Sequence, residues 1–194
     1  YGVKVDLSGG DITGTCNMQV NNQNALRFLR AFSCSGTIVL NGTTGNNYAN
    51  FYFQPASAGT LVQDVNIPAS KGGRIYGNAN ADWSGSTFTL QAGATLGIPD
   101  NNCAATDYSG LVVTLEGDAS FNLQYHYQDS GRGSFNGRFE GDSYFLTMSE
   151  PPQGSNRKNY IRGPGNWDIA GLVFNYPGFK CDIRAPNICG ASLD

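Results

Sequence analysis

Short runs in which apolar and polar residues alternate recur along most of this chain of 194 residues. Near the start, Val3, Val5 and Leu7 alternate with polar residues, and residues 12–20 repeat the pattern after a Gly-Gly-Asp turn. An alternation of period two places one face of a strand on a core and the other face in water. Similar runs cover residues 36–40, 48–54, 61–67, 86–92, 109–116, 119–128, 134–140, 143–149, 167–174 and 179–184.

Turn-forming residues separate these runs, since Gly, Asn, Asp or Pro stands between most of them. These residues supply the backbone angles that tight turns require. Many short strands joined by turns at this spacing are typical of two packed antiparallel sheets. The sequence therefore predicts a single all-β domain over residues 1–194. We expect an antiparallel β-sandwich or jelly roll of about ten to twelve short strands, with a barrel as the alternative.

One segment departs from the strand pattern. Leu26, Phe28, Leu29 and Phe32 recur at helical spacings of three and four residues, and an Asn before them can cap a helix. The spacing predicts one short helix near residues 22–33, which would cover an open end of the sandwich. We find no internal sequence repeat that would indicate a repeat architecture.

Charged residues are scarce, because Asp, Glu, Lys and Arg make up 14% of the chain, against about 25% in an average soluble protein. The 12 basic and 15 acidic side chains give a net charge of −3. This balance lacks the basic footprint of a nucleic-acid-binding protein. No run approaches the roughly 18 consecutive apolar residues of a membrane helix. We therefore expect no nucleic-acid partner and no membrane insertion.

Five cysteines bear on the cellular compartment. They include no CxxC pair and no Cys/His spacing suited to zinc, so disulfides in an oxidising compartment are the favoured interpretation. The pairs that close short loops are Cys16 with Cys34 and Cys181 with Cys189, which leaves Cys103 unpaired. The alternative is a cytosolic protein with five reduced cysteines.

Two further features favour a secreted, extracellular protein. The chain begins at Tyr1 rather than Met, as a chain does after removal of a signal peptide. The sequon Asn41-Gly42-Thr43, in a predicted turn, can accept an N-linked glycan at Asn41.

A predicted hairpin carries the candidate binding site. Its two strands cover residues 121–128 and 134–140, and alternation places amide, imidazole, guanidinium and carboxylate groups on one face. Such groups hydrogen-bond sugar hydroxyls, and Arg pairs with the carboxylate of a uronate. In the hairpin register Asn122 would face Glu140. The candidate ligand-binding residues are Asn122, Gln124, His126, Gln128, Asn136, Arg138 and Glu140.

We therefore expect a glycan-binding protein of lectin-like, adhesin-like or cell-wall-associated type, with an extracellular polysaccharide as its partner. A merely solvated polar strand face is the structural alternative. A protein-binding secreted effector or a structural protein is a further alternative. Aromatic side chains beside turns could add stacking surfaces for sugars. They are Trp83, Tyr108, Tyr160 and Trp167, of which Trp167 is better explained as a core residue.

A polysaccharide-cleaving enzyme, either a lyase or a glycosidase, is the alternative on the same strand face. His126, Arg138 and Glu140 would then be the catalytic residues. Gln124-Tyr125-His126 resembles the Gln-x-His motif of jelly-roll alginate-type lyases, which implies charge neutralisation by Gln124 and proton abstraction by His126. The longer motifs of those lyases do not occur in the chain. A single histidine and no phosphate-binding loop lead us to expect no metal and no cofactor.

Overall fold

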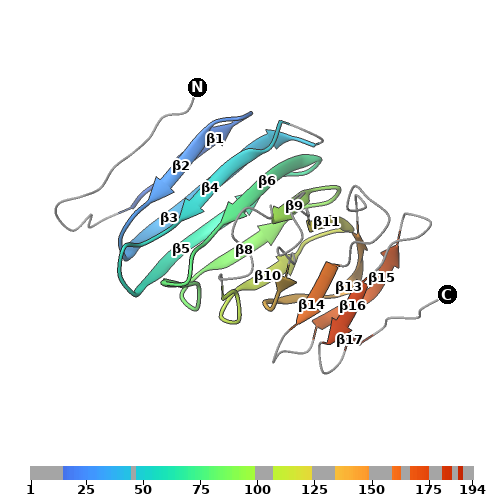
Figure 1. Ribbon diagram of the computed structural model, residues 1–194. Helices are drawn as coiled ribbons and strands as arrows, with labels where there is room; N and C mark the ends of the chain where they lie inside the picture. Colours follow the sequence, from blue (N-terminus) through green and yellow to red (C-terminus); the bar gives the residue numbers. More distant parts are fainter. Residues whose placement is uncertain are drawn as a thin grey trace.

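The computed structural model describes residues 15–44, 47–98, 107–123, 134–148, 159–162, 167–174, 181–184 and 188–189. Within these residues the chain forms a β-solenoid, in which strands follow one another along one axis in the order of the sequence (Figure 1). The neighbouring strands pair in parallel, and the described exception is the antiparallel contact of Gly42 with Gly72 and of Thr43 with Lys71. The predicted antiparallel β-sandwich or jelly roll is therefore wrong.

Two long stacks of parallel strands form the body of the solenoid. The first stack contains β1 (Met18–Asn21), β3 (Phe32–Thr43), β5 (Gly59–Ile67), β8 (Thr87–Leu90) and β10 (Val112–Leu115). The second stack contains β2 (Ala25–Phe28), β4 (Ala49–Phe53), β6 (Lys71–Tyr76), β9 (Thr95–Ile98) and β11 (Ala119–Leu123).

Two bent strands then belong to both stacks. The first half of β13 (Arg138–Met148) pairs with β10 and its second half with β11, and β15 (Trp167–Phe174) pairs along both halves of β13. Gly141, at the bend of β13, has a φ of +150°, a conformation that favours glycine. The bend lets one continuous strand turn the corner that separate strands turn in the earlier coils.

A third side of the solenoid is built from shorter pairings. β7 (Ala81–Asp82) pairs with the start of β5, and β12 (Ser134–Phe135), β14 (Asn159–Arg162) and β16 (Cys181–Arg184) form a separate parallel sheet. β17 (Ile188–Cys189) extends the first stack beyond β15. The described residues contain no helix long and apolar enough to cross a membrane.

The core lies inside the coils, where equivalent side chains of successive turns contact each other. In the first stack the inward positions are separated by 27, 23, 25 and 26 residues, from Ile38 to Val65, Phe88, Val113 and Phe139. These side chains are fully or almost fully buried. The variable spacing explains why the repeat cannot be found by a search for one fixed period.

Aromatic rings continue the core along the third side. The ring centroids of Trp83 and Tyr108 are 5.6 Å apart, and those of Tyr108 and Phe135 are 5.8 Å apart. Trp83 and Tyr108 are each 1% exposed, so the prediction that they are surface rings for sugar stacking is wrong. Trp167 is buried as expected of a core residue, and its indole N–H donates to the carbonyl of Gly137 over 3.0 Å. The side chain of Tyr160 lies outside the described residues.

The predicted helix near residues 22–33 is wrong. Residues 25–28 form β2, and Phe32 begins β3 after a short bend. Leu26, Phe28 and Phe32 all point into the core, and the rings of Phe28 and Phe32 stack with centroids 4.2 Å apart. Leu26 and Phe28 are inward residues of one strand, and Phe32 is the first inward residue after the corner. Phe28 and Phe32 are therefore four residues apart, a spacing that one face of a helix also gives.

Most of the predicted alternating runs are strands in the structure. Their neighbouring strands run parallel to them, however, not antiparallel as predicted. The predicted antiparallel hairpin is wrong, because Phe121 pairs in parallel with Met148 and Asn122 pairs with Gly97. Glu140 pairs with Thr114 and Asp168. The predicted hairpin of residues 3–7 and 12–20 lies largely outside the described residues.

The stacked core predicts a large cost for Phe139→Ala. The Phe139 ring is fully buried and lies 4.7 Å from Trp167 and 5.1 Å from Phe121 between centroids. Loss of such a side chain typically costs about 3–5 kcal/mol of unfolding free energy. Arg138→Ala, the matched control, removes an exposed neighbour whose described partner is Glu140, and should cost less than about 1 kcal/mol. Urea unfolding measures both, and equal losses would contradict this packing.

The thiols of Cys16 and Cys34 lie close together at one end of the described chain. The adjacent residues Thr15 and Ser35 form a parallel bridge, and Cys16 N–H donates to the carbonyl of Ser35 over 2.6 Å. Burial raises the pKa of the Cys16 thiol, and the neighbouring Cys34 raises it further. The Cys16–Cys34 disulfide remains a prediction that this placement favours. The side chains of Cys181 and Cys189, and all of Cys103, lie outside the described residues.

Mild oxidation should therefore link Cys16 to Cys34 and stabilise the protein. A closed loop of about this length contributes about 3 kcal/mol in the chain-entropy model. Because the thiolate is the reacting form and the pKa of Cys16 is raised, the bond should form faster as the pH increases above neutrality. Peptide mapping with thermal unfolding measures the bond and its effect. An unchanged melting temperature in the oxidised protein, compared with Cys34→Ser, would contradict the prediction.

Candidate functional site

A four-residue motif occurs twice on the third side of the solenoid. Asp82-Trp83-Ser84-Gly85 and Asp107-Tyr108-Ser109-Gly110 share an acid, an aromatic residue, Ser and Gly, with an offset of 25 residues. This repeat was not recognised from the sequence. It is the local signal in the sequence that indicates equivalent positions in successive turns.

Each copy of the motif fixes its carboxylate through a side-chain turn. The Ser84 N–H donates to Asp82 Oδ1 over 3.0 Å, and the Ser109 N–H donates to Asp107 Oδ1 over 2.9 Å. The final glycine lets the two turns stack, since a Cβ at Gly110 would lie 2.8 Å from the backbone nitrogen of Ser84. The two acids are therefore held in fixed orientations in neighbouring turns.

Neutral donors flank the two carboxylates on their outer sides. Thr60 Oγ1 donates to Asp82 Oδ2 over 2.8 Å, in the strand pairing of β5 with β7. Asn136 Nδ2 donates to Asp107 Oδ1 over 2.6 Å, and its Oδ1 accepts the backbone N–H of Tyr108 over 2.7 Å. The polar order along the axis is thus Thr60, Asp82, Asp107, Asn136, and we call these four residues the acid ladder.

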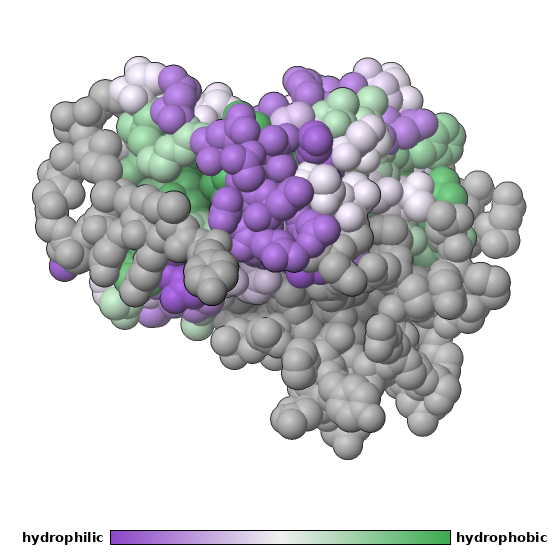
Figure 2. Space-filling model, turned by 90° about the horizontal axis from the view of Figure 1, so that it is seen from above, coloured by the Kyte–Doolittle hydropathy of each residue, from purple (hydrophilic) through white to green (hydrophobic). Residues whose placement is uncertain are grey.

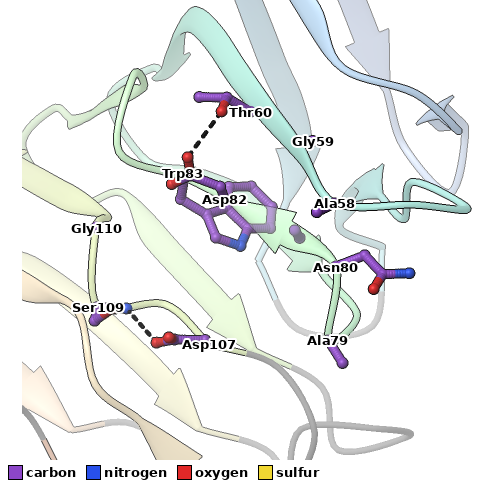
Figure 3. A pocket seen from close by; sticks show the side chains of 11 residues that line it. Ala58, Gly59, Thr60, Ala79, Asn80, Asp82, Trp83, Asp107, Ser109 and Gly110 are labelled. Carbon is purple, nitrogen blue, oxygen red and sulfur yellow. Dashed lines mark hydrogen bonds between the residues drawn. The ribbon is translucent and has the colours of Figure 1, made fainter.

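A cavity of about 420 Å³ opens at the acid ladder (Figure 3). Small residues leave space around the acids, among them Ala58, Gly59, Ala79 and Gly110. The volume lies within the range of about 300–1,000 Å³ that is typical of small-molecule sites. Asn80 also lines the cavity, and its side-chain Nδ2 donates to the carbonyls of Pro55 and Ala56.

Trp83 forms one wall of this cavity. Figure 3 shows the nitrogen edge of its indole ring turned toward the side where Asn80 and Asp107 lie. The indole nitrogen is buried and has no hydrogen-bond acceptor among the described residues. A buried donor without a partner costs about 1–3 kcal/mol, so this nitrogen is a local destabilising feature of the cavity wall.

Both carboxylates are held in the ionised form. The hydrogen bond from the Ser84 N–H is the largest cause of the lowered pKa of Asp82, and Thr60 lowers it further. The pKa of Asp107 is lowered mainly by the Ser109 N–H and also by Asn136, while burial and the charge of Asp82 oppose this. A glycosidase needs one carboxyl group with a raised pKa as its general acid. This pair therefore suits ligand binding rather than proton transfer at neutral pH.

The structure separates the residues of the predicted strand-face site. Asn122 is 1% exposed in the second stack, where its Nδ2 donates to the Tyr48 hydroxyl over 3.3 Å. Arg138 and Glu140 form an exposed ion pair at 2.8 Å on the first stack. Asn136 belongs to the acid ladder and thus lies beside the new cavity. Gln124, His126 and Gln128 lie outside the described residues, so the predicted catalytic role of His126 remains a prediction.

The outer surface of the first stack contains a second hollow, of about 450 Å³. Threonine and amide side chains line it together with Asp64 and Glu116, and Gln91 Nε2 donates to Glu116 Oε2 over 3.4 Å. Figure 2 likewise shows hydrophilic residues gathered over the middle of the face seen from above, with apolar residues beside them. This hollow lacks the aromatic wall of the cavity at the acid ladder.

The glycosylation residue predicted from the sequence lies in a strand rather than a turn. Asn41 is part of β3, pairs with Asn21 of β1, and donates from Nδ2 to Asn21 Oδ1 over 3.1 Å. Its modification remains a prediction.

Within the described part of the chain, no group of three or more His, Cys, Asp or Glu side chains is arranged to hold a metal ion. No protein-family model, curated protein or solved structure matches this chain significantly. The site is therefore interpreted from its own geometry.

The lowered pKa values predict how acid affects folding. Asp82 and Asp107 have lowered values relative to the ordinary 3.8, so their stabilisation is complete above about pH 4 and is lost as the pH falls through the lowered pKa. Replacing both with Asn keeps an acceptor oxygen and removes the titration. Thermal unfolding should show a shallower loss of stability below about pH 4 in the double variant. Parallel pH profiles for the two proteins would contradict this assignment.

Proposed function

We propose that this protein binds a neutral polysaccharide in the cavity at the acid ladder. The observation that carries the proposal is the pair of ionised carboxylates, Asp82 and Asp107, in equivalent positions of successive turns. An ionised carboxylate only accepts hydrogen bonds, so it favours a ligand rich in hydroxyl donors. Thr60 and Asn136 occupy the outer sides of the pair and leave the space between the acids for such donors.

The charge of the cavity selects between neutral and acidic glycans. Two fixed negative charges would repel a uronate, and no described cationic side chain lines the cavity. A neutral sugar has hydroxyl groups that can donate to both acids and carries no charge for them to repel. This composition favours neutral glycans over the uronate polymers considered from the sequence.

The repeated motif favours a polymer over a single sugar. Neighbouring strands in a sheet are about 4.8 Å apart, so a solenoid offers equivalent groups at short, regular intervals along its axis. A polysaccharide lying along this axis would present hydroxyl groups to Asp82 and Asp107 in succession. Secretion is part of the proposal, because binding an extracellular polymer requires it and because the predicted Cys16–Cys34 disulfide needs an oxidising compartment.

Co-sedimentation with a panel of insoluble neutral and acidic polysaccharides tests the proposal. The wild-type protein should deplete onto at least one neutral polymer. Asp82→Asn and Asp107→Asn should each weaken that binding about tenfold, since a hydrogen bond to a charged group contributes about 1.5–3 kcal/mol. Asp168→Asn is the matched control, because Asp168 is exposed on β15 outside the cavity, and it should leave the affinity unchanged.

Equal binding by Asp107→Asn and Asp168→Asn would contradict the site. Mass spectrometry of the soluble fraction distinguishes binding from cleavage in the same experiment. A binding protein should release no new oligosaccharides. Release that persists in wild type but is lost in the Asp variants would show an enzyme instead.

A further inference from the structure

Charge is divided among the outer surfaces of the solenoid. Acidic side chains occur on the first stack and on the third side, including Asp64, Glu116, Asp82 and Asp107. The described outward positions of β2, β4, β6, β9 and β11 contain no Asp or Glu. The second stack instead carries two arginines, Arg27 and Arg74, that form no ion pair with a described residue. The described part of the second stack therefore carries positive charge without nearby acids, which suits an anion.

Arg74 is held at the centre of this surface. Its guanidinium carbon lies 4.2 Å from the centroid of the Tyr48 ring, and Tyr48 is itself fixed by the Asn122 amide. Gly97, the strand neighbour of Arg74, makes room for the side chain, since a Cβ there would lie 2.9 Å from Arg74 Cγ. The Arg74 Nε is buried and has no acceptor within the described residues.

A second column of side chains lies beside Arg74. Arg27, Tyr52 and Tyr76 occupy one register position on β2, β4 and β6. The Arg27 guanidinium carbon lies 4.5 Å from the Tyr52 centroid, and the Tyr52 and Tyr76 rings stack at 4.1 Å. The Tyr76 hydroxyl donates to Asn50 Oδ1 over 3.3 Å. Stacking restricts the side chains, so the two cations are positioned before any ligand arrives.

From this arrangement we infer that the Arg27/Arg74 surface is a second binding site, which takes the carboxylate or sulfate groups of an acidic polysaccharide. Arg has a planar fork of donors that matches an oxyanion, and the Arg74 guanidinium is held in place by the Tyr48 ring. The site lies on a different side of the solenoid from the acid ladder, and its opposite charge selects a ligand of opposite chemical character. This inference does not depend on the neutral-glycan proposal.

The tyrosines beside the arginines add no charge to this surface. Burial, together with the neighbouring Tyr52, raises the pKa of Tyr76 to about 12, although Arg74 opposes the shift. The Tyr76 phenol therefore remains neutral at physiological pH and adds no negative charge beside the arginines.

Affinity chromatography of the full chain on three immobilised polymers tests the site. The polymers are a sulfated, a carboxylated and a neutral polysaccharide, at low salt of about 50 mM. The wild-type protein should be retained on at least one acidic polymer and elute as salt increases. Arg74→Gln should weaken this affinity about tenfold, whereas Arg74→Lys should recover only part of it, because Lys keeps the charge but loses the fork.

Arg30→Gln is the matched control, since Arg30 is exposed in the bend after β2 and the substitution makes the same charge change. Its effect on affinity should stay below about twofold. Equal losses in Arg74→Gln and Arg30→Gln, or no retention of wild type on either acidic polymer, would overturn the inference. Full recovery by Arg74→Lys would likewise show that net charge alone is responsible.

The same columns separate this site from the acid ladder. Asp107→Asn should leave retention on the acidic polymer unchanged, and Arg74→Gln should leave neutral-polymer binding unchanged. The second result also shows that Arg74→Gln is folded. Loss of both activities in Arg74→Gln, with intact folding by circular dichroism, would show that there is one shared site and would overturn the inference.

Discussion

Parallel stacking of each turn on the previous one is the constraint on which this structure depends. A side chain that points inward must fit the equivalent side chain of the next turn, because neighbouring strands are only about 4.8 Å apart. Ile38, Val65, Phe88, Val113 and Phe139 meet this requirement in the first stack. Where a turn must lie directly on another, as at Gly110 over Ser84, a side chain would not fit. The core is therefore one continuous cluster built from stacked columns that contact each other.

The same stacking is unfavourable for charged residues, because equivalent positions in successive turns bring like charges close together. Asp82 and Asp107 tolerate this arrangement since each accepts a backbone N–H and a neutral side-chain donor. Their mutual repulsion is visible in the opposing effect of Asp82 on the pKa of Asp107. A ligand that donates hydrogen bonds to both acids would reduce that repulsion. The proposed preference for hydroxyl groups is consistent with this stacking.

The sequence revealed where the strands are but not which way they run. Alternation in residues 61–67 or 167–174 is the same for a parallel strand with one wet face as for an antiparallel strand. Parallel sheets are usually buried on both faces, and a solenoid departs from that rule because its outer face meets water. The inward Leu26, Phe28 and Phe32 imitated a helix because a corner falls between them. For the site, Asn136 could be predicted from its side-chain chemistry. Its partner Asp107 could not, because the two residues are far apart in the sequence and meet only when successive turns stack.

The solenoid places acidic and basic groups on different faces, so they do not pair with each other as they would in a single cleft. Asp82 and Asp107 lie on the third side, whereas Arg27 and Arg74 lie on the second stack, and the packed core stands between the two surfaces. If the arginines faced the acids, they would form ion pairs, and neither set would be available to a ligand. Keeping them apart leaves the acids to accept from hydroxyl groups and the arginines to donate to oxyanions. With both proposed sites occupied, such a protein would connect two chemically different polymers, and the packed core between the faces would set the distance between them.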